Sequence, residues 1–592
     1  MWRLPLERGI SPALVATALI LASGLLLASP AHAERVTGLM VYHTAGQTFL
    51  TWRGAGKDVQ HYTVYRSRSS LRTALALGKA EQIFTVRPGA SNDRRMSAIL
   101  GYPVYHRFPG PAGQLGPGVE CFVVTTAQSG SWFYAVTATT RRGEERVVRP
   151  GGNATASAVR ERTATPRPIR WAQLQYEGRQ VEVFTHWASN VDAPGYPAMV
   201  NVPSYPFHFA VRKRGRSGAH PLLVRLHGRG DHFLGNLNGT GHPQEYVLAL
   251  DDELPGLTRG TFWFGYNLGV DIHGAVTPAP SGGVVLDYTQ RRVLWTVEWA
   301  LRSLPLDPSR VYVSGTSMGG SGAVFLSQTF PRLFAAGVAL IPRLRYAVRD
   351  SADTPRGKGT MHAFDALWGN PRGNPLMLDG SRVYDVLDAV QQFRRSAETP
   401  LRIVAGSRDA VVGWKQLAAT LRAADSLHRG LVAYWDDRDH DTHGRHYWTA
   451  QQDGWELYRY HRERSWPSFS NVSEGQWPAD SSRRGMMNAG IEWFEPLVDL
   501  PTLWSVGVRR CSVQSGEGVL ATPGTITATI SPRRVQRFQL RAGQSYECRL
   551  LEGERVVYTA TVRCAREGEL NVPAVPVGWY PLRFEIRPIL AP

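Results

Sequence analysis

A serine stands in a glycine-flanked turn at residues 315–319 (GTSMG). The apolar run 311–314 leads directly into this turn, and the stretch 320–330 that follows is compatible with a helix. A strand, a sharp turn and a helix form the context that exposes a serine hydroxyl as a nucleophile. Glycines on both sides let strand and helix approach closely while the serine occupies a strained backbone region. The sequence therefore predicts that Ser317 is a nucleophile; the alternative is a glycine-rich turn that only packs.

A second turn follows an earlier apolar run, at residues 227–230 (HGRG). Glycines in such a turn allow backbone amides to face an oxygen that becomes negatively charged during a reaction. The amide of Gly228 or Arg229, together with that of Met318, is therefore the expected oxyanion donor set. His227 is expected to be a structural hydrogen-bonding residue, because the base of such a site follows the nucleophile in the chain.

A carboxylate that orients the base is expected after a later strand. Residues 401–405 (LRIVA) predict a buried strand, and Asp409 follows it in a Gly-Ser-Arg-Asp turn. Asp409 is therefore the candidate acid of the site. The alternative is an aspartate that only shapes a turn or caps a helix.

The base is expected in the loop after the last core strand, residues 431–435. This loop holds three histidines, so the sequence determines its location better than the identity of the base. His440 comes first after the strand and is the leading candidate. His443, which precedes a glycine, is the alternative base, and His446 is the third histidine.

The histidines and aspartates of this loop could instead bind a divalent cation, because imidazoles and carboxylates at short spacing are metal ligands. Serine chemistry is complete without a metal. We therefore expect neither a catalytic metal nor a cofactor.

Alternating strands and helices along residues 169–480 must position these groups. Residues 288–304 have apolar side chains near helical spacing. Apolar runs that predict strands lie at 221–226, 261–265, 311–314, 337–341, 401–405 and 431–435. Such alternation favours a doubly wound, mostly parallel sheet.

Period-two alternation on both sides of this segment predicts β-structure. Residues 34–160 contain several short strands between turn residues, which favours an antiparallel sandwich. Residues 485–592 predict a small all-β domain, and the proline-rich segment 163–168 is typical of a linker. Neither flanking domain is expected to contribute to the triad. A protein trimmed to residues 165–480 is expected to keep turnover of small soluble esters if it folds.

Four motifs of the middle segment, roughly 170–460, resemble the α/β-hydrolase superfamily: LHGRG, GTSMGGSGA, RDAVVGW and DRDH. The segment looks most like secreted esterases of the polyhydroxyalkanoate-depolymerase and feruloyl-esterase type, and like prolyl-oligopeptidase domains. The resemblance implies an oxyanion loop, the nucleophile Ser317, the acid Asp409 and the base His440. It also implies cofactor-free hydrolysis of esters, or less often of peptides or amides, without fixing the substrate. The three-histidine loop departs from the family pattern and leaves the base open.

The N-terminal segment resembles a fibronectin type III domain. The resemblance rests on Trp52, on the strand motif YTVYRS and on the later strand motif YAVTAT. The middle of the segment is atypically long for that family.

The first 33 residues are typical of a secretory signal peptide. Arg3 and Arg8 precede the apolar run 10–29, and Ala-His-Ala follows at 31–33, so cleavage is expected before Glu34. The alternative is an uncleaved anchor. No later apolar stretch is long enough to span a bilayer, so we expect a secreted or periplasmic protein without stable membrane insertion.

The chain of 592 residues has four cysteines, which form neither a disulfide framework nor a zinc-site spacing. One bridge among Cys511, Cys548 and Cys564 could form in an oxidising compartment, and the sequence does not determine the pairing.

The net charge of +18 would suit a nucleic-acid-binding protein. The arginines that carry it are scattered along the chain, so we predict no nucleic-acid partner. A basic surface that attracts polyanionic substrate or cell-surface material is the alternative.

Together these features predict an exported serine hydrolase that cleaves carboxylic esters through an acyl-enzyme, with polymeric or cell-wall-linked esters as candidate substrates. One alternative is a serine peptidase of the prolyl-oligopeptidase type, although the N-terminal segment is too short for a propeller. The other is a catalytically inactive adhesion or scaffold protein. The sequence leaves open the oligomeric state and what the flanking domains bind.

Overall fold

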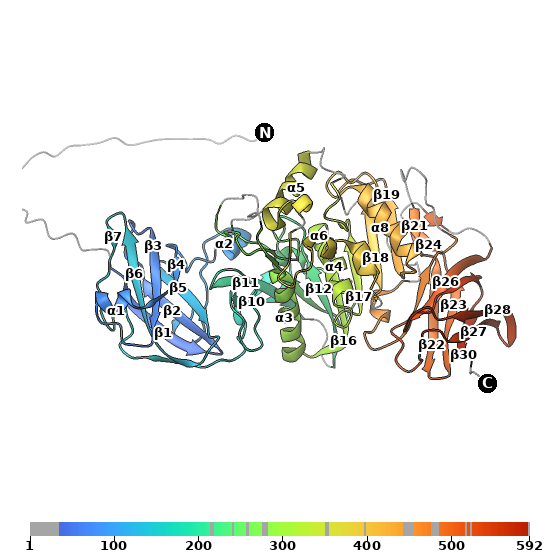
Figure 1. Cartoon of the computed structure of the whole chain (residues 1–592), viewed down its shortest axis with the longest axis horizontal. Helices are drawn as coiled ribbons and strands as arrows, with labels where there is room; N and C mark the ends of the chain where they lie inside the picture. Colours follow the sequence, from blue (N-terminus) through green and yellow to red (C-terminus); the bar gives the residue numbers. More distant parts are fainter. Residues whose placement is uncertain are drawn as a thin grey trace, which may run out of the picture.

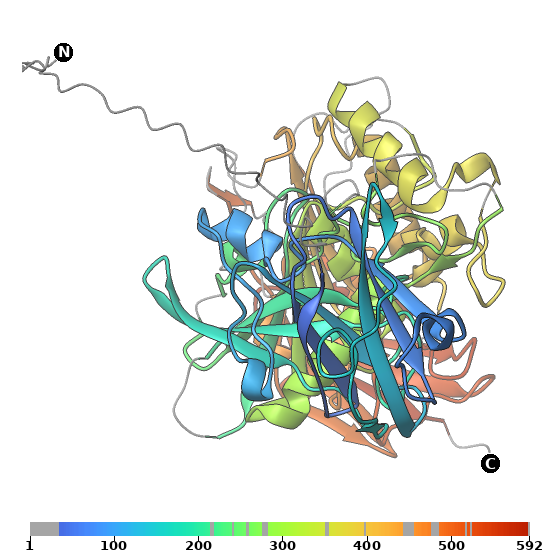
Figure 2. The same ribbon diagram turned by 90° about the vertical axis from the view of Figure 1, so that its left-hand side faces the viewer.

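The computed structural model shows three parts that follow one another along the long axis of the molecule (Figure 1). Viewed along that axis, the N-terminal strands lie in front of the central and C-terminal parts (Figure 2). The structure describes residues 35–213, 218–239, 242–255, 260–274, 282–349, 355–373, 375–395, 398–441, 455–474, 485–515, 518–520 and 524–589.

The N-terminal part consists of two antiparallel sheets, with strand orders β1-β2-β5 and β4-β3-β6-β7, and with β8 paired to β6. Trp52, Tyr62 and Tyr134 are buried in the core between the strands, so the β-structure expected here is present. Its elements are β1 (Thr37–Thr44), β2 (Gln47–Arg53), β3 (His61–Ser67), α1 (Ala74–Gly78), β4 (Glu81–Val86), α2 (Arg94–Leu100), η1 (Gly110–Ala112), β5 (Val119–Thr125), β6 (Gly130–Thr140), β7 (Gly143–Glu144) and β8 (Val159–Glu161).

The long connection between β4 and β5 carries α2, which lies at the junction with the central part (Figure 1). The side chain of Asp93 caps the helix by accepting the amide hydrogen of Met96 at 3.0 Å. Gly101 ends it in a left-handed conformation with φ of 78°. The atypically long middle of this segment therefore contains a short helix at the junction with the central part.

A ten-stranded sheet forms the central part, in the order β21-β19-β18-β17-β16-β12-β13-β11-β10-β9. The neighbouring strands from β13 to β19 run parallel, whereas β9, β10, β11 and β21 are antiparallel to their neighbours. The mostly parallel sheet expected from the sequence is therefore present. Its strands are β9 (Ile169–Tyr176), β10 (Arg179–Ala188), β11 (Tyr205–Arg212), β12 (His220–Leu226), β13 (Tyr246–Leu250), β16 (Leu306–Thr316), β17 (Ala336–Leu340), β18 (Leu401–Gly406), β19 (Leu431–Asp436) and β21 (Gly485–Met487).

The helices of the central part pack together against one face of this sheet, in a single apolar cluster. They are α3 (Tyr288–Ser303), α4 (Met318–Thr329), α5 (Pro355–Trp368), α6 (Val383–Val386), α7 (Ala389–Phe393) and α8 (Trp414–Ser426). The remaining elements are the short helices η2 (Phe233–Asn236) and η3 (Pro371–Gly373) and the hairpin β14 (Tyr266–Asn267) with β15 (Val285–Leu286).

The other face of the sheet is covered largely by the flanking parts of the chain. Alternate side chains of a strand point to opposite faces. On β18, Ile403 packs among the helices, whereas Val404 belongs to a cluster with Trp466 and Trp504 of the C-terminal part. The expected doubly wound arrangement therefore holds on one face only, as far as the described residues go.

The same alternation occurs nearer the N-terminal part. On β11, Phe209 packs among the helices, whereas Ala210 lies in a cluster with Met96 of α2 and Phe233 of η2. Apolar periodicity predicts that a strand has two buried faces, but it does not identify what covers each face.

The expected strand at 261–265 is a turn, and the strand β13 just before it was not predicted. Phe262 and Trp263 have positive φ angles of 54° and 59°, which a strand does not allow. The Asp252 side chain accepts the amide hydrogens of Thr261 and Trp263, each at 3.0 Å. The prediction was wrong because a short apolar run indicates burial and not conformation.

The C-terminal part contains a three-stranded sheet, β20-β26-β29, a five-stranded sheet, β22-β23-β30-β27-β28, and the hairpin β24-β25. Its strands interleave with the central part across the expected boundary, because β20 pairs with β26 while the later strand β21 pairs with β19. The elements are η4 (Leu457–Arg459), β20 (Trp466–Ser470), β22 (Ile491–Leu500), β23 (Leu503–Arg510), β24 (Val513–Ser515), β25 (Gly518–Leu520), β26 (Ile526–Arg533), β27 (Ser545–Glu552), β28 (Arg555–Arg563), β29 (Val572–Val577) and β30 (Leu582–Pro588).

All four cysteines lie in the described residues and all are free thiols, so the bridge considered among Cys511, Cys548 and Cys564 is absent. The proposed signal peptide, residues 1–33, lies outside the described residues. Among the residues that are described, no helix combines the length and the apolar character needed to cross a membrane.

Candidate active site

Ser317 lies in the turn between β16 and α4, with φ of 56° and ψ of −117°. The turn is tight: a Cβ atom on Gly315 would lie 2.2 Å from the carbonyl oxygen of Gly319, and one on Gly319 would lie 2.0 Å from that of Leu226. Only glycine fits both positions, which explains the flanking glycines of the motif. The strained backbone thus holds the Ser317 side chain at the carboxyl edge of the parallel strands.

Three side chains that are far apart in the sequence lie in one hydrogen-bonded series. The Ser317 Oγ atom lies 2.7 Å from Nε2 of His440, and Nδ1 of His440 lies 2.7 Å from Oδ2 of Asp409. Because a carboxylate only accepts hydrogen bonds, Nδ1 carries the proton and Nε2 is free to accept from the serine hydroxyl. The structure therefore brings together the leading candidates for nucleophile, base and acid.

Asp409 lies just beyond β18, and its side chain is 0 % exposed. Its Oδ1 atom accepts the amide hydrogens of Val411 and Val412 at 2.8 and 3.0 Å. These bonds hold Oδ1 in place and leave Oδ2 for the imidazole of His440. The geometry is that of an orienting carboxylate rather than of a simple turn residue.

His440 lies in the loop after β19, and its side chain is 13 % exposed. The start of this loop is held by an ion pair between the buried side chains of Asp436 and Arg438. Two other histidines of the loop, His443 and His446, lie outside the described residues.

The turn after β12 lies beside the nucleophile. A Cβ atom on Gly228 would lie 3.4 Å from the carbonyl oxygen of Thr316 and 3.8 Å from Cβ of Ser317. The first amides of a helix have no partner within the helix, and Met318 is the first residue of α4. The amides of Gly228, Arg229 and Met318 thus belong to backbone segments that converge around Ser317.

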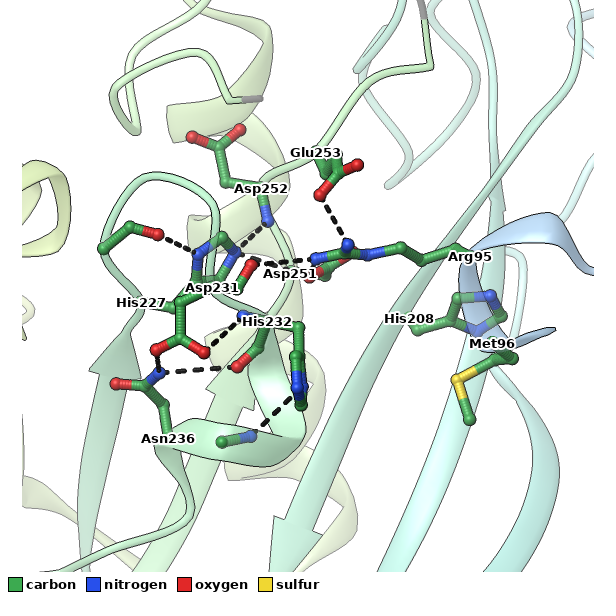
Figure 3. Close-up of polar contacts among 12 residues, drawn as sticks. Arg95, Met96, His208, His227, Asp231, His232, Asn236, Asp251, Asp252 and Glu253 are labelled. Atoms are coloured by element: carbon green, nitrogen blue, oxygen red, sulfur yellow. Dashed lines mark hydrogen bonds and ion pairs between the residues drawn. The ribbon is translucent and has the colours of Figure 1, made fainter. Parts of the chain in front are cut away.

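His227 is fully buried and binds backbone, as the sequence indicated. Its Nδ1 donates to the carbonyl of Gly228 at 2.8 Å, and its Nε2 accepts the amide hydrogen of Asp252 at 2.8 Å (Figure 3). The Trp263 indole donates to the carbonyl of His227 at 3.1 Å. His227 therefore fixes the loop beside Ser317 and does not contact the serine.

A cavity of about 280 Å³ adjoins Ser317 and His440. Its wall combines apolar side chains with two arginines, and it is lined by Arg229, Phe262, Met318, Ser321, Arg343, Thr360, Phe364, Val411 and Val412. A larger cavity of about 540 Å³ lies between the N-terminal and central parts and includes none of the three residues of the hydrogen-bonded series. The described residues hold no group of three or more His, Cys, Asp or Glu side chains arranged to bind a metal.

Residues 275–464 match the family model described as an esterase family, and this segment contains Ser317, Asp409 and His440. The chain is therefore similar to that esterase family over less than half of its length. Acetylxylan esterase A of Emericella nidulans is 46% identical over 43 residues, which are 7% of this chain and 14% of that protein. The chain thus matches only a small share of this curated relative.

Solved structures of serine hydrolases are also similar. An S-formylglutathione hydrolase from Agrobacterium tumefaciens is 17% identical, covers 47% of this chain and 93% of its own, and has a TM-score of 0.33. The acylaminoacyl peptidase of Pyrococcus horikoshii is 12% identical, covers 68% of this chain and 59% of its own, and has a TM-score of 0.31. These scores carry no argument about the fold, which is described by the mostly parallel order of the strands from β13 to β19.

Proposed function

We propose that the protein is an exported esterase that forms its acyl-enzyme on Ser317, with His440 as the base and Asp409 as the residue that orients it. The observation that carries this proposal is the continuous series of two 2.7 Å hydrogen bonds from Ser317 through His440 to Asp409. A serine with a strained backbone at the start of a helix, hydrogen-bonded in this way, has the geometry of an activated nucleophile.

In the proposed mechanism, Nε2 of His440 takes the hydroxyl proton of Ser317 as Oγ attacks the acyl carbon. Asp409 stabilises the imidazolium that forms, and His440 then gives its proton to the leaving alcohol. A water molecule, deprotonated by His440, attacks the acyl-enzyme. This second step releases the carboxylic acid and restores the serine.

The negative charge of each tetrahedral intermediate is held by backbone amides. Met318 offers its amide from the start of α4, where the helix dipole also favours negative charge. Gly228 or Arg229 provides the second amide from the adjacent turn. The closeness of Gly228 to Ser317 supports this assignment.

We further propose that the substrate is a polymeric or cell-wall-linked ester outside the cytoplasm. The short stretch of identity with an acetylxylan esterase favours acyl groups carried by polysaccharide. The signal-peptide pattern of residues 1–33 and the N-terminal β-domain, which we propose is of fibronectin type III kind, suit an exported enzyme that docks to its substrate. No nucleic-acid partner and no cofactor form part of this proposal.

Labelling with a fluorophosphonate, followed by turnover of p-nitrophenyl esters and peptide anilides, tests the proposal. We expect Ser317 to be labelled and esters to be cleaved, with little turnover of anilides. Ser317→Ala should abolish labelling and lower ester turnover by about 10⁴–10⁶-fold. Labelling that persists in Ser317→Ala would contradict the nucleophile, preferred cleavage of anilides would favour a peptidase, and a folded but inert wild type would favour a scaffold protein.

A further inference from the structure

The helix α2 of the N-terminal part is anchored on the central part by a buried side chain. Met96 is 0% exposed and lies in an apolar cluster with Phe233 and Leu234 of η2 and with Val183 of β10. This anchor places the neighbouring residue, Arg95, at the loops that follow β12 and β13. Figure 3 shows Arg95 extending from α2 toward these loops.

The guanidinium of Arg95 binds both loops at once. Its Nε and Nη2 atoms donate to the two carboxylate oxygens of Asp251, each at 2.7 Å. Nη2 also donates to the carbonyl of Asp231 at 3.1 Å, and Nη1 pairs with Glu253 at 2.5 Å. A planar guanidinium with several donors can join these acceptors in one fixed geometry, and a lysine ammonium cannot.

Two of these acceptors, Asp231 and Asp251, are connected to the turn beside the nucleophile. The amide of Asp231 donates to the carbonyl of Gly228 at 3.2 Å, which closes the turn that holds Gly228 and Arg229. Asp252, which follows Asp251 in the chain, donates its amide hydrogen to Nε2 of His227, and Nδ1 of His227 donates to the carbonyl of Gly228. Arg95 is therefore joined to the oxyanion turn by two short routes.

The positive charge of Arg95 stabilises the negative charge of the buried Asp251 carboxylate. Asp251 is buried, which opposes its ionised form, but the charge of Arg95 and the hydrogen bonds that Arg95 donates lower the pKa of its carboxyl well below the usual range. The Asp251 carboxylate is therefore ionised and held in place at neutral pH. A rigid charged group at this position keeps the loop ends fixed.

We propose that Arg95 is a positioning residue for catalysis, and that the N-terminal β-domain thereby completes the oxyanion turn of the hydrolase. The inference rests on the proposed function, because it gives the Gly228 and Arg229 amides their role. Arg95 is not among the residues that line the cavity beside Ser317; it acts by fixing the loops through Asp251 and Asp231. Oxyanion donors must lie within a few tenths of an ångström of their acceptor, so a small shift of the turn lowers the rate.

The test compares Arg95→Met with Arg94→Met in the full chain. Arg94 is the exposed neighbour on the same helix, so its variant removes the same charge without touching the loops. For p-nitrophenyl acetate, we expect Arg95→Met to lower kcat about 10–100-fold with KM changed less than about threefold. Fluorophosphonate labelling should slow in parallel, because phosphonylation uses the same amides. Arg94→Met should stay within about twofold of wild type.

Two further variants separate positioning from folding. Arg95→Lys can pair with Asp251 but cannot also hold the Asp231 carbonyl, so its kcat should lie between those of wild type and Arg95→Met. In Arg95→Ala, added guanidinium at tens of millimolar should restore part of kcat, whereas sodium chloride at equal ionic strength should not.

The outcomes distinguish this inference from the proposed function. A folded Arg95→Met with wild-type kcat and labelling rate would overturn the inference and leave the esterase proposal intact. If that variant does not fold, Arg95→Lys decides, and a wild-type kcat in it would overturn the inference. A wild type that is labelled but cleaves no ester would contradict the esterase proposal, and the labelling rates of the variants would still test Arg95.

Discussion

Nδ1 of His440 lies 2.7 Å from Oδ2 of Asp409, whose other oxygen is held by two backbone amides. The carboxylate cannot rotate away from the imidazole without losing those amides. It therefore selects the tautomer in which Nε2 faces Ser317 without a proton. This single contact determines whether the serine hydroxyl has an acceptor.

Asp409→Asn should lower kcat for p-nitrophenyl esters by about 10⁴-fold while the protein remains folded, because an amide can donate to Nδ1 and stabilise the wrong tautomer. Asp437→Asn is the matched control. Asp437 lies in the same region, is 38 % exposed and should tolerate the change. Equal losses in the two variants would contradict the role of Asp409.

His440→Gln should reduce ester turnover by a similar factor of about 10⁴, since a side-chain amide is too weak a base to take the proton of the Ser317 hydroxyl. His443→Gln is expected to keep activity within a few-fold of wild type. Steady-state kinetics of the two proteins decide between the histidines of this loop. The reverse pattern would move the role of base to His443.

Gly319→Ala should destabilise the protein by about 1–3 kcal/mol, because its Cβ would meet the backbone of Leu226 at 2.0 Å and one of the two segments must move. The Gly228 turn follows Leu226, so activity should fall as well. Gly359→Ala is the control, since a Cβ atom there meets nothing within 4 Å. Urea unfolding measures the stability of both variants. An unchanged free energy of unfolding in Gly319→Ala would contradict the tight packing of the turn at Ser317.

Arg534→Met should cost about 2–4 kcal/mol in the free energy of unfolding. Arg534 lies in the C-terminal part and donates to the carbonyls of Phe334 and Ala335, each at 2.8 Å. Burial lowers the pKa of Arg534 to about 10, so it stays charged at neutral pH, and its loss leaves the buried carbonyls unpaired. The exposed Arg537→Met should change stability by less than about 0.5 kcal/mol. Matching denaturation midpoints for the two variants would contradict this role.

The stability difference between wild type and Arg95→Met should depend on pH. The pKa of the Asp251 carboxyl is lowered in the folded protein, so its pairing with Arg95 stabilises the protein fully above the unfolded pKa of about 4. That contribution is lost as pH falls further, toward the lowered folded pKa. Thermal melting from pH 7 to pH 3 should show a constant difference in Tm above about pH 5 and a shrinking one below about pH 4. A difference that does not change with pH would contradict the ionised pair.

The structure changes the expectation for a protein trimmed to residues 165–480. Such a protein would lack Met96 and Arg95, and it would expose Val404, Val432 and other apolar side chains that the C-terminal part covers. We now expect it to aggregate or to lose activity. The flanking β-structure supports the active site as well as any docking function.

The sequence by itself predicted the serine-based chemistry and its location along the chain. The strand and the glycines around Ser317 predicted a nucleophile turn, and the strand before Asp409 predicted the place of the acid, because a strand that ends in a sharp turn is a local pattern. The choice of His440 in a three-histidine loop was a preference that local pattern could not decide, because a loop residue is placed by what it packs against.

Only the tertiary structure decided which segments complete the site. Arg95 has no signal in the sequence: it is one arginine among many, on a short helix inside a β-rich segment. Its role depends on the packing of Met96 against η2. This contact brings together Arg95 and Asp251, which are 156 positions apart in the chain. For the same reason, the sequence did not predict that the N- and C-terminal parts cover the second face of the central sheet. Apolar periodicity records that a side chain is buried, whereas its partner is determined by long-range packing.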